Sequence, residues 1–284
     1  MRFLKKLVPN AYIALILVFI YLPIAILIIY SFNSLPKSFI WGGFTFDNYK
    51  SLFKGSDGSG ILESLLETLK VAAIASVAST VFGVLSSLGL AYLNKKLQNF
   101  AMTMTYVPNV MPDLVTGISF MLLFSFLGVQ KSEFTLIMAH IALCVPFAIL
   151  SISPKIKQLD KSLTEAAMDL GATRFQTLRL VIIPEIMPGI LSSLLLTFTL
   201  SIDDYLISNF NVDSSIQTLP MMIYSMAKLG VNPKMNALTT LMFGAVLILM
   251  VLSNLSVWRV LPLRKEKVPI PSCQAALSSG MLLS

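Results

Sequence analysis

Six long runs of apolar residues, separated by shorter polar segments, dominate the chain. A window of about 19 residues places these runs near positions 8–31, 66–93, 104–127, 134–153, 188–209 and 237–260. Each run is long enough to cross about 30 Å of hydrocarbon as a helix that rises about 1.5 Å per residue. Because hydrocarbon offers the backbone no hydrogen-bond partner, we expect all six runs to be helical. The pattern therefore predicts an all-α membrane protein with six transmembrane helices.

The composition agrees with this prediction and narrows the surroundings of the chain. Of its 284 residues, 56% are hydrophobic and 12% are charged, whereas roughly 25% of the residues of a soluble domain are charged. The formal net charge of +7 could indicate nucleic acid, but in membrane proteins an excess of Lys and Arg usually marks cytoplasmic loops. We therefore expect a lipid bilayer around the chain and no nucleic-acid partner.

Lys and Arg residues are divided unequally between the two sides of the predicted membrane. If the N-terminus lies inside, the inner segments hold fourteen of these residues and the outer segments hold seven. By the positive-inside rule, both termini are expected in the cytoplasm. The first run, near residues 7–30, is longer than the apolar core of a signal peptide, and no small-residue cleavage site follows it. We therefore interpret it as an uncleaved span.

Two of the predicted connections are long. The outer segment, residues 32–65, contains a glycine-rich stretch at 55–60 that predicts a flexible turn. The inner segment between spans four and five, residues 154–187, is polar, carries charges of both signs and keeps a helical pattern. A long, structured cytoplasmic loop of this kind favours a docking partner. The alternative is an amphipathic linker that touches only lipid headgroups.

The inner segment predicts two short helices joined by a sharp elbow. Ser162 and Glu165 fit a capping box at the start of the first helix. Gly171 is placed to end that helix in the left-handed conformation. Thr173 can cap a second helix, which Pro184 is expected to stop.

This loop also resembles the cytoplasmic loop of the permease subunits of ABC importers. In that family the loop carries Glu-Ala-Ala, three residues, Gly, nine residues and then Ile-x-Leu-Pro. The corresponding residues here are Glu165-Ala166-Ala167, Gly171 and Val181-Ile182-Ile183-Pro184, with one branched aliphatic residue exchanged for another at two positions. In the family this loop is a coupling helix that sits in a cleft of the ATP-hydrolysing subunit. The resemblance, which extends over about residues 5–260, implies the same role for residues 162–171.

The resemblance implies the other parts of the assembly. The partners would be a dimer of ABC ATPase subunits, a second homologous permease and an extracytoplasmic solute-binding protein, in the cytoplasmic (inner) membrane of a bacterium. The chain has no Gly-x-x-x-x-Gly-Lys-Ser/Thr phosphate loop. The partner ATPase would therefore use ATP and Mg²⁺, while this chain would bind no cofactor or metal and catalyse no reaction. We expect residues 1–264 to form the permease domain and residues 265–284 to form a disordered cytoplasmic tail.

Three aspartates fall inside the predicted spans, where a charged side chain costs at least about 2.5–3.5 kcal/mol on insertion scales. Asp113 lies near the middle of the third span. Pro108 and Pro112 precede it and Gly117 follows it, so we expect the helix to be kinked or open there. Interrupted helices at this depth often mark a transport pathway.

The other two aspartates, Asp203 and Asp204, lie in the fifth span. Adjacent helical residues point about 100° apart, so we expect one to contact solute and the other to bind a neighbouring helix. Tyr205 offers a face for a cation–π contact. The alternative is that the aspartates bond to Ser, Thr or backbone groups and only fix the packing. His140, the only histidine, is interpreted as a helix-to-helix hydrogen bond rather than a proton relay.

Several further stretches resemble the permeases of bacterial importers for the polyamines spermidine and putrescine. They are Met111-Pro112-Asp113, Ile137-Met138-Ala139-His140, Ser201-Ile202-Asp203-Asp204, and Ile223-Tyr224-Ser225-Met226 followed by Asn236-Ala237-Leu238. A polyamine carries two or more ammonium groups, and spaced carboxylates are suitable weak counter-charges for them. The resemblance therefore implies polyamine uptake by alternating access. The residues expected on the path are Asp113, Asp203, Asp204 and Tyr205.

Three other interpretations stay open from the sequence. The first is an ABC permease for a different small solute. The second is an ion-coupled secondary transporter in which the intramembrane aspartates carry protons or sodium, although six spans without a visible repeat are few for that class. The third is a membrane scaffold without a solute pathway. The second does not account for the loop motif, and neither the second nor the third requires a phosphate-loop ATPase as a partner.

Overall fold

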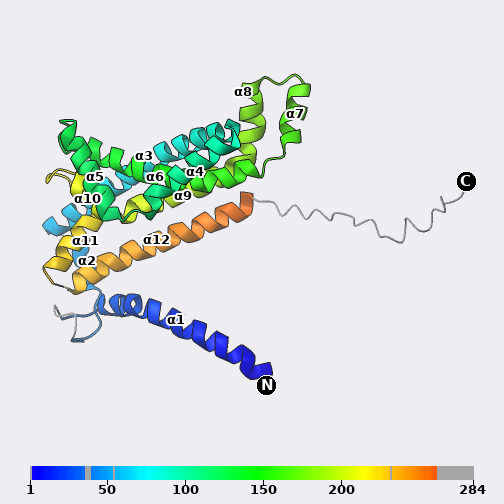
Figure 1. Cartoon of the computed structure of the whole chain (residues 1–284). Helices are drawn as coiled ribbons and strands as arrows, with labels where there is room; N and C mark the ends of the chain where they lie inside the picture. Colours follow the sequence, from blue (N-terminus) through cyan, green and yellow to red (C-terminus); the bar gives the residue numbers. More distant parts are fainter. Residues whose placement is uncertain (1, 36–39, 54, 231, 261–284) are drawn as a thin grey trace, which may run out of the picture.

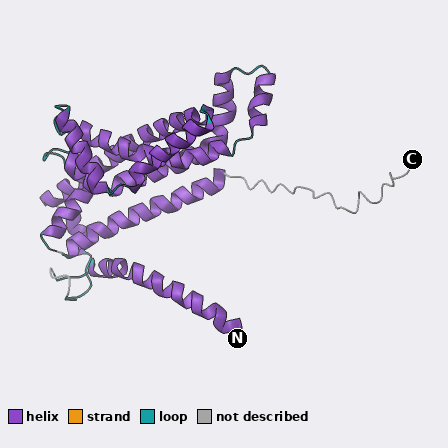
Figure 2. Ribbon diagram, viewed as in Figure 1, coloured by secondary structure: helices purple, strands orange, loops and turns teal. Residues whose placement is uncertain are grey.

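The computed structural model describes residues 2–35, 40–53, 55–230 and 232–260, and these residues are almost entirely helical (Figure 2). The helical segments are α1 (Arg2–Tyr30), α2 (Asp47–Leu52), α3 (Gly55–Tyr92), α4 (Lys95–Val110), α5 (Asp113–Phe126), α6 (Glu133–Lys157), α7 (Lys161–Asp169), α8 (Arg174–Thr177), the π-helical turn η1 (Leu178–Ile182), α9 (Ile183–Asp203), α10 (Leu206–Asn211), α11 (Leu219–Lys228) and α12 (Pro233–Val260). The predicted all-α fold is confirmed. The predicted tail, 265–284, lies outside the described residues.

Five helices of the described chain are long and apolar enough to cross a membrane. They are Tyr12–Tyr30, Gly60–Tyr92, Glu133–Lys157, Arg174–Asp203 and Pro233–Val251. The predicted third span, 104–127, is not one straight helix, because α4 and α5 meet at an angle of 103°. Pro108 lies in the last turn of α4 and Pro112 precedes α5, and neither proline can donate the backbone hydrogen bond that would continue a helix. The expected kink is therefore a full break.

Two further expectations about boundaries are wrong. The glycine-rich stretch 55–60 is the first part of α3 and not a turn, because a helix nucleated by the apolar run gains one hydrogen bond for each residue that it adds. The predicted fifth span, 188–209, ends early, since α9 stops at Asp203 and the following residues form the separate helix α10.

Helices α3, α6 and α9 pack together as the core of the bundle (Figure 1). Small and hydroxyl-bearing side chains lie at their contacts, as is common between membrane helices. A Cβ added to Gly83 of α3 would lie 2.6 Å from the Cβ of Ala148 in α6, so only glycine permits this approach. The hydroxyls of Thr80 and Ser193 lie 3.4 Å apart between α3 and α9. These close contacts hold α3, α6 and α9 together as one packed core.

Helix α1 diverges from the bundle and contacts α12 (Figure 1). None of its span from Tyr12 to Tyr30 is buried by the rest of the chain, and its side chains are almost all apolar. A surface of this kind is stable only against lipid or another apolar subunit.

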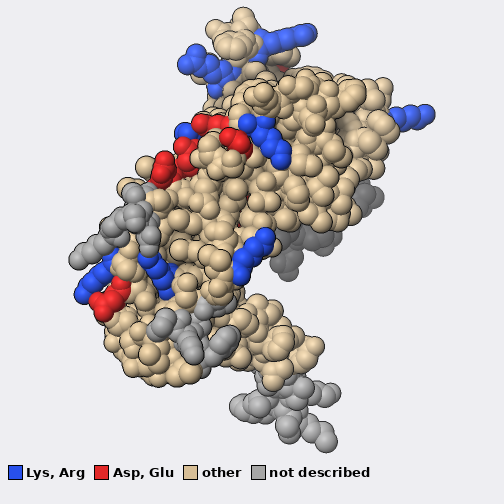
Figure 3. Space-filling view, turned by 90° about the vertical axis from the view of Figure 1, so that its left-hand side faces the viewer, with Lys and Arg blue, Asp and Glu red and all other residues tan. Residues whose placement is uncertain are grey.

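The two ends of the molecule differ. The α7–α8 elbow, the N-terminal end of α1 and the C-terminal end of α12 lie at one end (Figure 1). The other end carries α2, α10 and α11. Figure 3 faces that end and shows a surface that is mostly uncharged, with the Lys, Arg, Asp and Glu side chains in a few groups.

Candidate functional site

The helical conformation is interrupted between α9 and α10, at Asp204. The backbone of this residue is extended, with φ −67° and ψ 125°, and this ends α9 at Asp203. The Asp204 carboxylate accepts hydrogen bonds from the amides of Ile207 (3.2 Å) and Ser208 (2.8 Å), so it caps the first turn of α10. Because aspartate favours helix caps over helix interiors, the pair of aspartates was a signal in the sequence that could have indicated this break.

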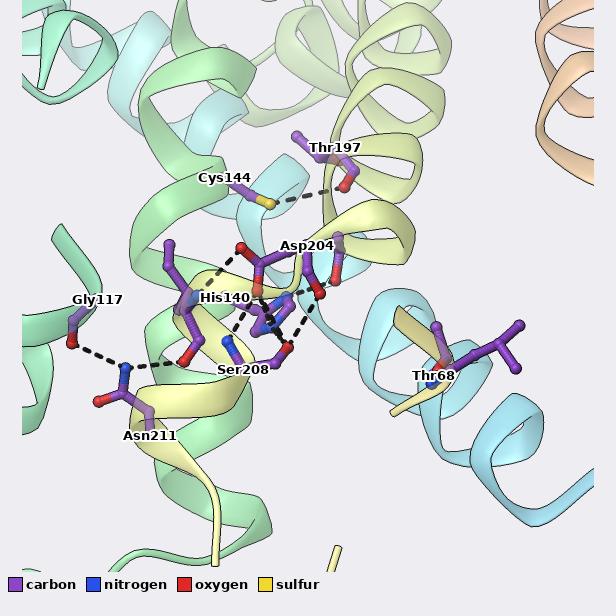
Figure 4. A network of polar contacts seen from close by, with 11 residues as sticks. Thr68, Gly117, His140, Cys144, Thr197, Asp204, Ser208 and Asn211 are labelled. Atoms are coloured by element: carbon purple, nitrogen blue, oxygen red, sulfur yellow. Dashed lines mark hydrogen bonds and ion pairs between the residues drawn. The ribbon is translucent and has the colours of Figure 1, made fainter. Parts of the chain in front are cut away.

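The buried ring of His140, in α6, lies against the break (Figure 4). Its Nδ1 is 2.7 Å from the hydroxyl of Ser201, which precedes the break. Its Nε2 is 3.0 Å from the hydroxyl of Ser208, which follows the break, and 3.5 Å from a carboxylate oxygen of Asp204. The prediction of a helix-to-helix hydrogen bond at His140 is confirmed, and the ring makes two such bonds.

The direction of these hydrogen bonds follows from the carboxylate. The Ser208 hydroxyl lies 3.0 Å from Oδ2 of Asp204 and is placed to donate its proton to that oxygen. Ser208 therefore donates to Asp204 and accepts from Nε2–H of His140. The Nδ1 atom of a neutral imidazole is then an acceptor, and the Ser201 hydroxyl donates to it. This assignment gives both ring nitrogens and the carboxylate a partner.

The other end of α10 is bonded to α5 and α6. Asn211 is fully buried, and its Nδ2 donates to the carbonyl of Gly117 in α5 (3.1 Å). The backbone carbonyl of Asn211 accepts from the hydroxyl of Thr135 in the first turn of α6 (2.7 Å). A Cβ at Gly117 would lie 3.2 Å from the ring of Phe210, so glycine permits α10 to approach α5. These bonds join α5, α6 and α10 into one unit.

A cleft of about 370 Å³ opens beside the break. Its lining residues come from α5, α6 and the α9–α10 segment: Asp113, Leu143, Phe147, Leu200, Asp203, Asp204, Tyr205 and Leu206. The four aspartate and tyrosine residues singled out in the sequence thus surround one cleft. Asp113 and Asp203 are exposed, whereas the side chain of Asp204 is only 7% exposed because it is held by α10 and His140.

One face of Tyr205 is already occupied. Its ring stacks on that of Tyr224 in α11, with the centroids 4.1 Å apart and the planes at 28°. The Nζ of Lys228 lies 4.9 Å from the centroid of the Tyr224 ring. Tyr224 is not among the residues predicted on the path, because it lies in a separate helix, many residues after the break. Among the residues that the structure describes, no group of three or more His, Cys, Asp or Glu side chains could hold a metal ion.

The predicted capping box of the α7–α8 elbow is wrong. Helix α7 begins at Lys161, and its cap is Asp160, whose carboxylate accepts from the amide of Ser162 (2.9 Å). This bond lowers the pKa of Asp160 below its ordinary value. Ser162 lies inside the first turn and so cannot cap it. Glu165 and Ala166 are exposed on α7, Ala167 is half-buried, and Leu170 is 90% exposed.

The predicted glycine cap is confirmed, but the predicted end of the second helix is not. Gly171 has φ +88°, and Thr173 caps α8 by accepting from the amide of Gln176. Pro184 does not stop this helix, since α8, η1 and α9 run on from Arg174 to Asp203. The amide of Ile183 bonds to the carbonyl of Leu178, five residues earlier. This wider π-turn accommodates the proline within the helix.

Comparison with known proteins relates this architecture to a family of transporters. Residues 79–261 match the family described as binding-protein-dependent transport system inner membrane component. The chain is 36% identical to the spermidine/putrescine transport system permease protein PotC of Escherichia coli K12 over 250 residues, which cover 88% of this chain and 94% of PotC. It is 37% identical to the putrescine transport system permease protein PotI of the same strain, over 80% of this chain and 83% of PotI.

Solved structures show the same fold at lower identity. A bacterial ABC transporter involved in the import of alginate matches with a TM-score of 0.64 and 16% identity, over 90% of this chain and 96% of that chain. The MetNI methionine ABC transporter, in an inward-facing conformation, matches with a TM-score of 0.62 and 17% identity, over 73% of this chain and 100% of that chain. The chain therefore belongs to the inner membrane permease components of binding-protein-dependent ABC transport systems.

Proposed function

We propose that this chain is the permease subunit of an ATP-driven importer that moves polyamines into the cytoplasm. The observation that carries the proposal is an acidic cleft in a chain that is 36% identical to a spermidine/putrescine permease along nearly its whole length. Two exposed carboxylates beside a broken helix suit a solute with two or more ammonium groups. Carboxylates that are few and spaced bind such a cation weakly enough to release it.

The roles of the cleft residues follow from their contacts. Asp203 and Asp113 are the counter-charges for the ammonium groups, since both are exposed. Asp204 supports the site indirectly, because its carboxylate accepts hydrogen bonds from backbone amides of α10. Tyr205 lines the path, and its pairing with Tyr224 extends the aromatic wall. Leu143, Phe147 and Leu200 provide apolar contacts for the methylene groups of a polyamine.

The energy for transport comes from a partner in this proposal. Residues 162–171 form the coupling helix that docks on an ABC ATPase dimer, and Glu165, Ala166 and Ala167 are its contact surface, supported by the exposure of Glu165 and Ala166. Gly171 sets the shape of the elbow between α7 and α8, and Pro184 lies within the continuous helix that connects this elbow to the end of α9. The ATPase binds ATP and Mg²⁺, and this chain binds no cofactor.

The proposed topology places the elbow in the cytoplasm. The excess of Lys and Arg on the elbow's side of the membrane supports this orientation, and both chain ends then lie inside. Residues 1–264 of this chain form one half of the pathway, and a second homologous permease forms the other half. A solved alginate transporter in complex with its periplasmic protein has the same fold, with a TM-score of 0.63. We infer that a solute-binding protein docks at the α2–α10–α11 end.

A transport assay in cells tests the proposed function. This chain would be expressed with its co-encoded partners in a bacterium that lacks polyamine uptake. We expect labelled spermidine or putrescine to accumulate, and the uptake to be lost when the ATPase partner carries an inactivated phosphate loop. Accumulation of neither polyamine, with all subunits present in the membrane, would show that the solute is a different one.

A further inference from the structure

His140 links helices α9 and α10, which follow one another in the chain but are separated by the break at Asp204. One ring nitrogen bonds to Ser201, in the last turn of α9, and the other bonds to Ser208, in the first turns of α10. The three side chains are all buried. A buried imidazole left without partners would destabilise the fold, so the two hydroxyls and the ring require one another. The bridge spans the break at Asp204.

These two bonds exclude an unbroken helix. In a continuous α-helix, positions 201 and 208 would lie seven residues apart, which is about 10.5 Å along the axis at 1.5 Å per residue. One imidazole ring cannot bond to both hydroxyls over that separation with distances of 2.7 Å and 3.0 Å. The bonds of His140 are therefore available only when the chain turns aside after Asp203. The ring selects the broken arrangement over the straight one.

The break determines whether other side chains cover Asp203. In a continuous helix, side chains three and four positions further on lie back over the preceding turn, so residues 206 and 207 would cover position 203. In the structure, α10 leaves this direction and the Asp203 side chain is exposed at the cleft. Helix α6 also holds the far end of α10, through the bond from Thr135 to the carbonyl of Asn211.

We propose that His140 is a positioning residue of the transport site, which holds α9 and α10 in the broken arrangement that keeps the Asp203 carboxylate open to the cleft. The ring does not touch the solute, since Ser201, Ser208 and Asp204 surround it. The part of this inference that concerns solute rests on the proposed function. The part that concerns the exposure of position 203 does not.

The first test measures that exposure in the assembled transporter. The two native cysteines are replaced (Cys144→Ala and Cys273→Ala), Asp203→Cys is introduced, and the complex in proteoliposomes is treated with a cationic methanethiosulfonate. We expect His140→Phe to slow the modification about tenfold, a change of about 1.4 kcal/mol. Ser208→Ala should slow it in the same direction, and His140→Gln, which keeps a donor and an acceptor, should recover part of the rate.

Ser153→Ala is the matched control. Ser153 is a buried residue of the same helix, and its hydroxyl bonds to Ser87 of α3, away from the break. This variant should leave the modification rate unchanged. A rate that is the same in His140→Phe, Ser208→Ala and the parent complex would overturn the proposal. If the complex with His140→Phe does not assemble, the modification rate measured with Ser208→Ala alone decides whether the proposal holds.

The second test asks whether His140 acts through Asp203. The readout is the number of spermidine molecules imported per ATP hydrolysed, with native cysteines. We expect His140→Phe and Asp203→Asn each to lower this ratio, and the double variant to be no worse than Asp203→Asn alone. Independent, multiplying losses would overturn the proposal. Absence of spermidine uptake in the wild type would contradict the proposed function, while the thiol measurement would still decide the role of His140.

Discussion

Asp203 and Asp204 are neighbours in the chain, but their carboxylates have different surroundings. Asp203 is exposed at the cleft, and Asp204 accepts two backbone amides and lies beside His140. The expectation that the two would face different ways followed from helix geometry. Helix geometry could not show that the helix ends between them, because the choice depends on Ser208 and on a histidine from another helix.

Replacing the exposed carboxylate should impair transport without harming the fold. Asp203→Asn keeps the shape and removes the charge. A hydrogen bond to a charged group is worth about 1.5–3 kcal/mol, so we expect spermidine uptake to fall roughly tenfold to a hundredfold. Initial uptake rates at equal amounts of assembled complex measure this. Asp203→Glu, which keeps the charge, should stay much closer to wild type, and unchanged uptake in Asp203→Asn would remove this residue from the path.

At the scale of elements, the apolar runs indicated the helices well and their interruptions less well. Pro184 was expected to stop a helix, yet a π-turn carries the chain past it. Pro112 interrupts the chain completely, with a bend of 103°. The two prolines differ in the backbone before them, which is extended at Met111 and Pro112 and helical before Pro184, and a local sequence pattern does not show this difference. Likewise, the capping box fitted the sequence, but the true cap of α7 is Asp160, two residues before Ser162.

The cap of α7 is tested by a pair of substitutions. Asp160→Ala removes the acceptor for the Ser162 amide, whereas Asp160→Asn keeps one, because Asn is a good cap. We expect faster amide hydrogen exchange in the first turn of α7 in Asp160→Ala only. Because the pKa of Asp160 is lowered in the folded state, the stabilisation by the charged cap is present above the unfolded pKa and is lost as the pH falls through the lower folded value. Near neutral pH the charged cap is fully present, so the faster exchange in Asp160→Ala should be seen there at its full size.

The glycine at the elbow sets the direction of the chain after α7. At φ +88°, a residue with a Cβ costs roughly 1–2 kcal/mol, so Gly171→Ala should loosen the elbow. We expect a lower rate of ATP hydrolysis when the loaded solute-binding protein is added, with less ATPase retained on purification. Gly171→Asn should be milder, since Asn adopts the left-handed region more readily. Equal behaviour of the glycine, asparagine and alanine forms would mean that the elbow does not transmit force.

At the scale of the whole molecule, hydropathy was sufficient to predict a helical membrane protein and the order of its spans. It was not sufficient to predict that α3, α6 and α9 form the core or that α1 stands apart. Those features depend on close approaches such as Gly83 against Ala148, and on the apolar surface of α1 that the rest of the chain leaves uncovered. The cleft was predictable only in part. Its acidic residues stand out in the sequence, but its walls come from four separate helices, which a local pattern does not bring together.

The most direct test of the whole account is uptake into proteoliposomes that contain the purified complex of this chain with its partner subunits. The lumen holds ATP and Mg²⁺, and the outside holds labelled spermidine with the solute-binding protein. We predict uptake that requires lumenal ATP and is unaffected when proton and sodium gradients are collapsed. Uptake that proceeds without ATP and follows either gradient would contradict the account and identify an ion-coupled transporter.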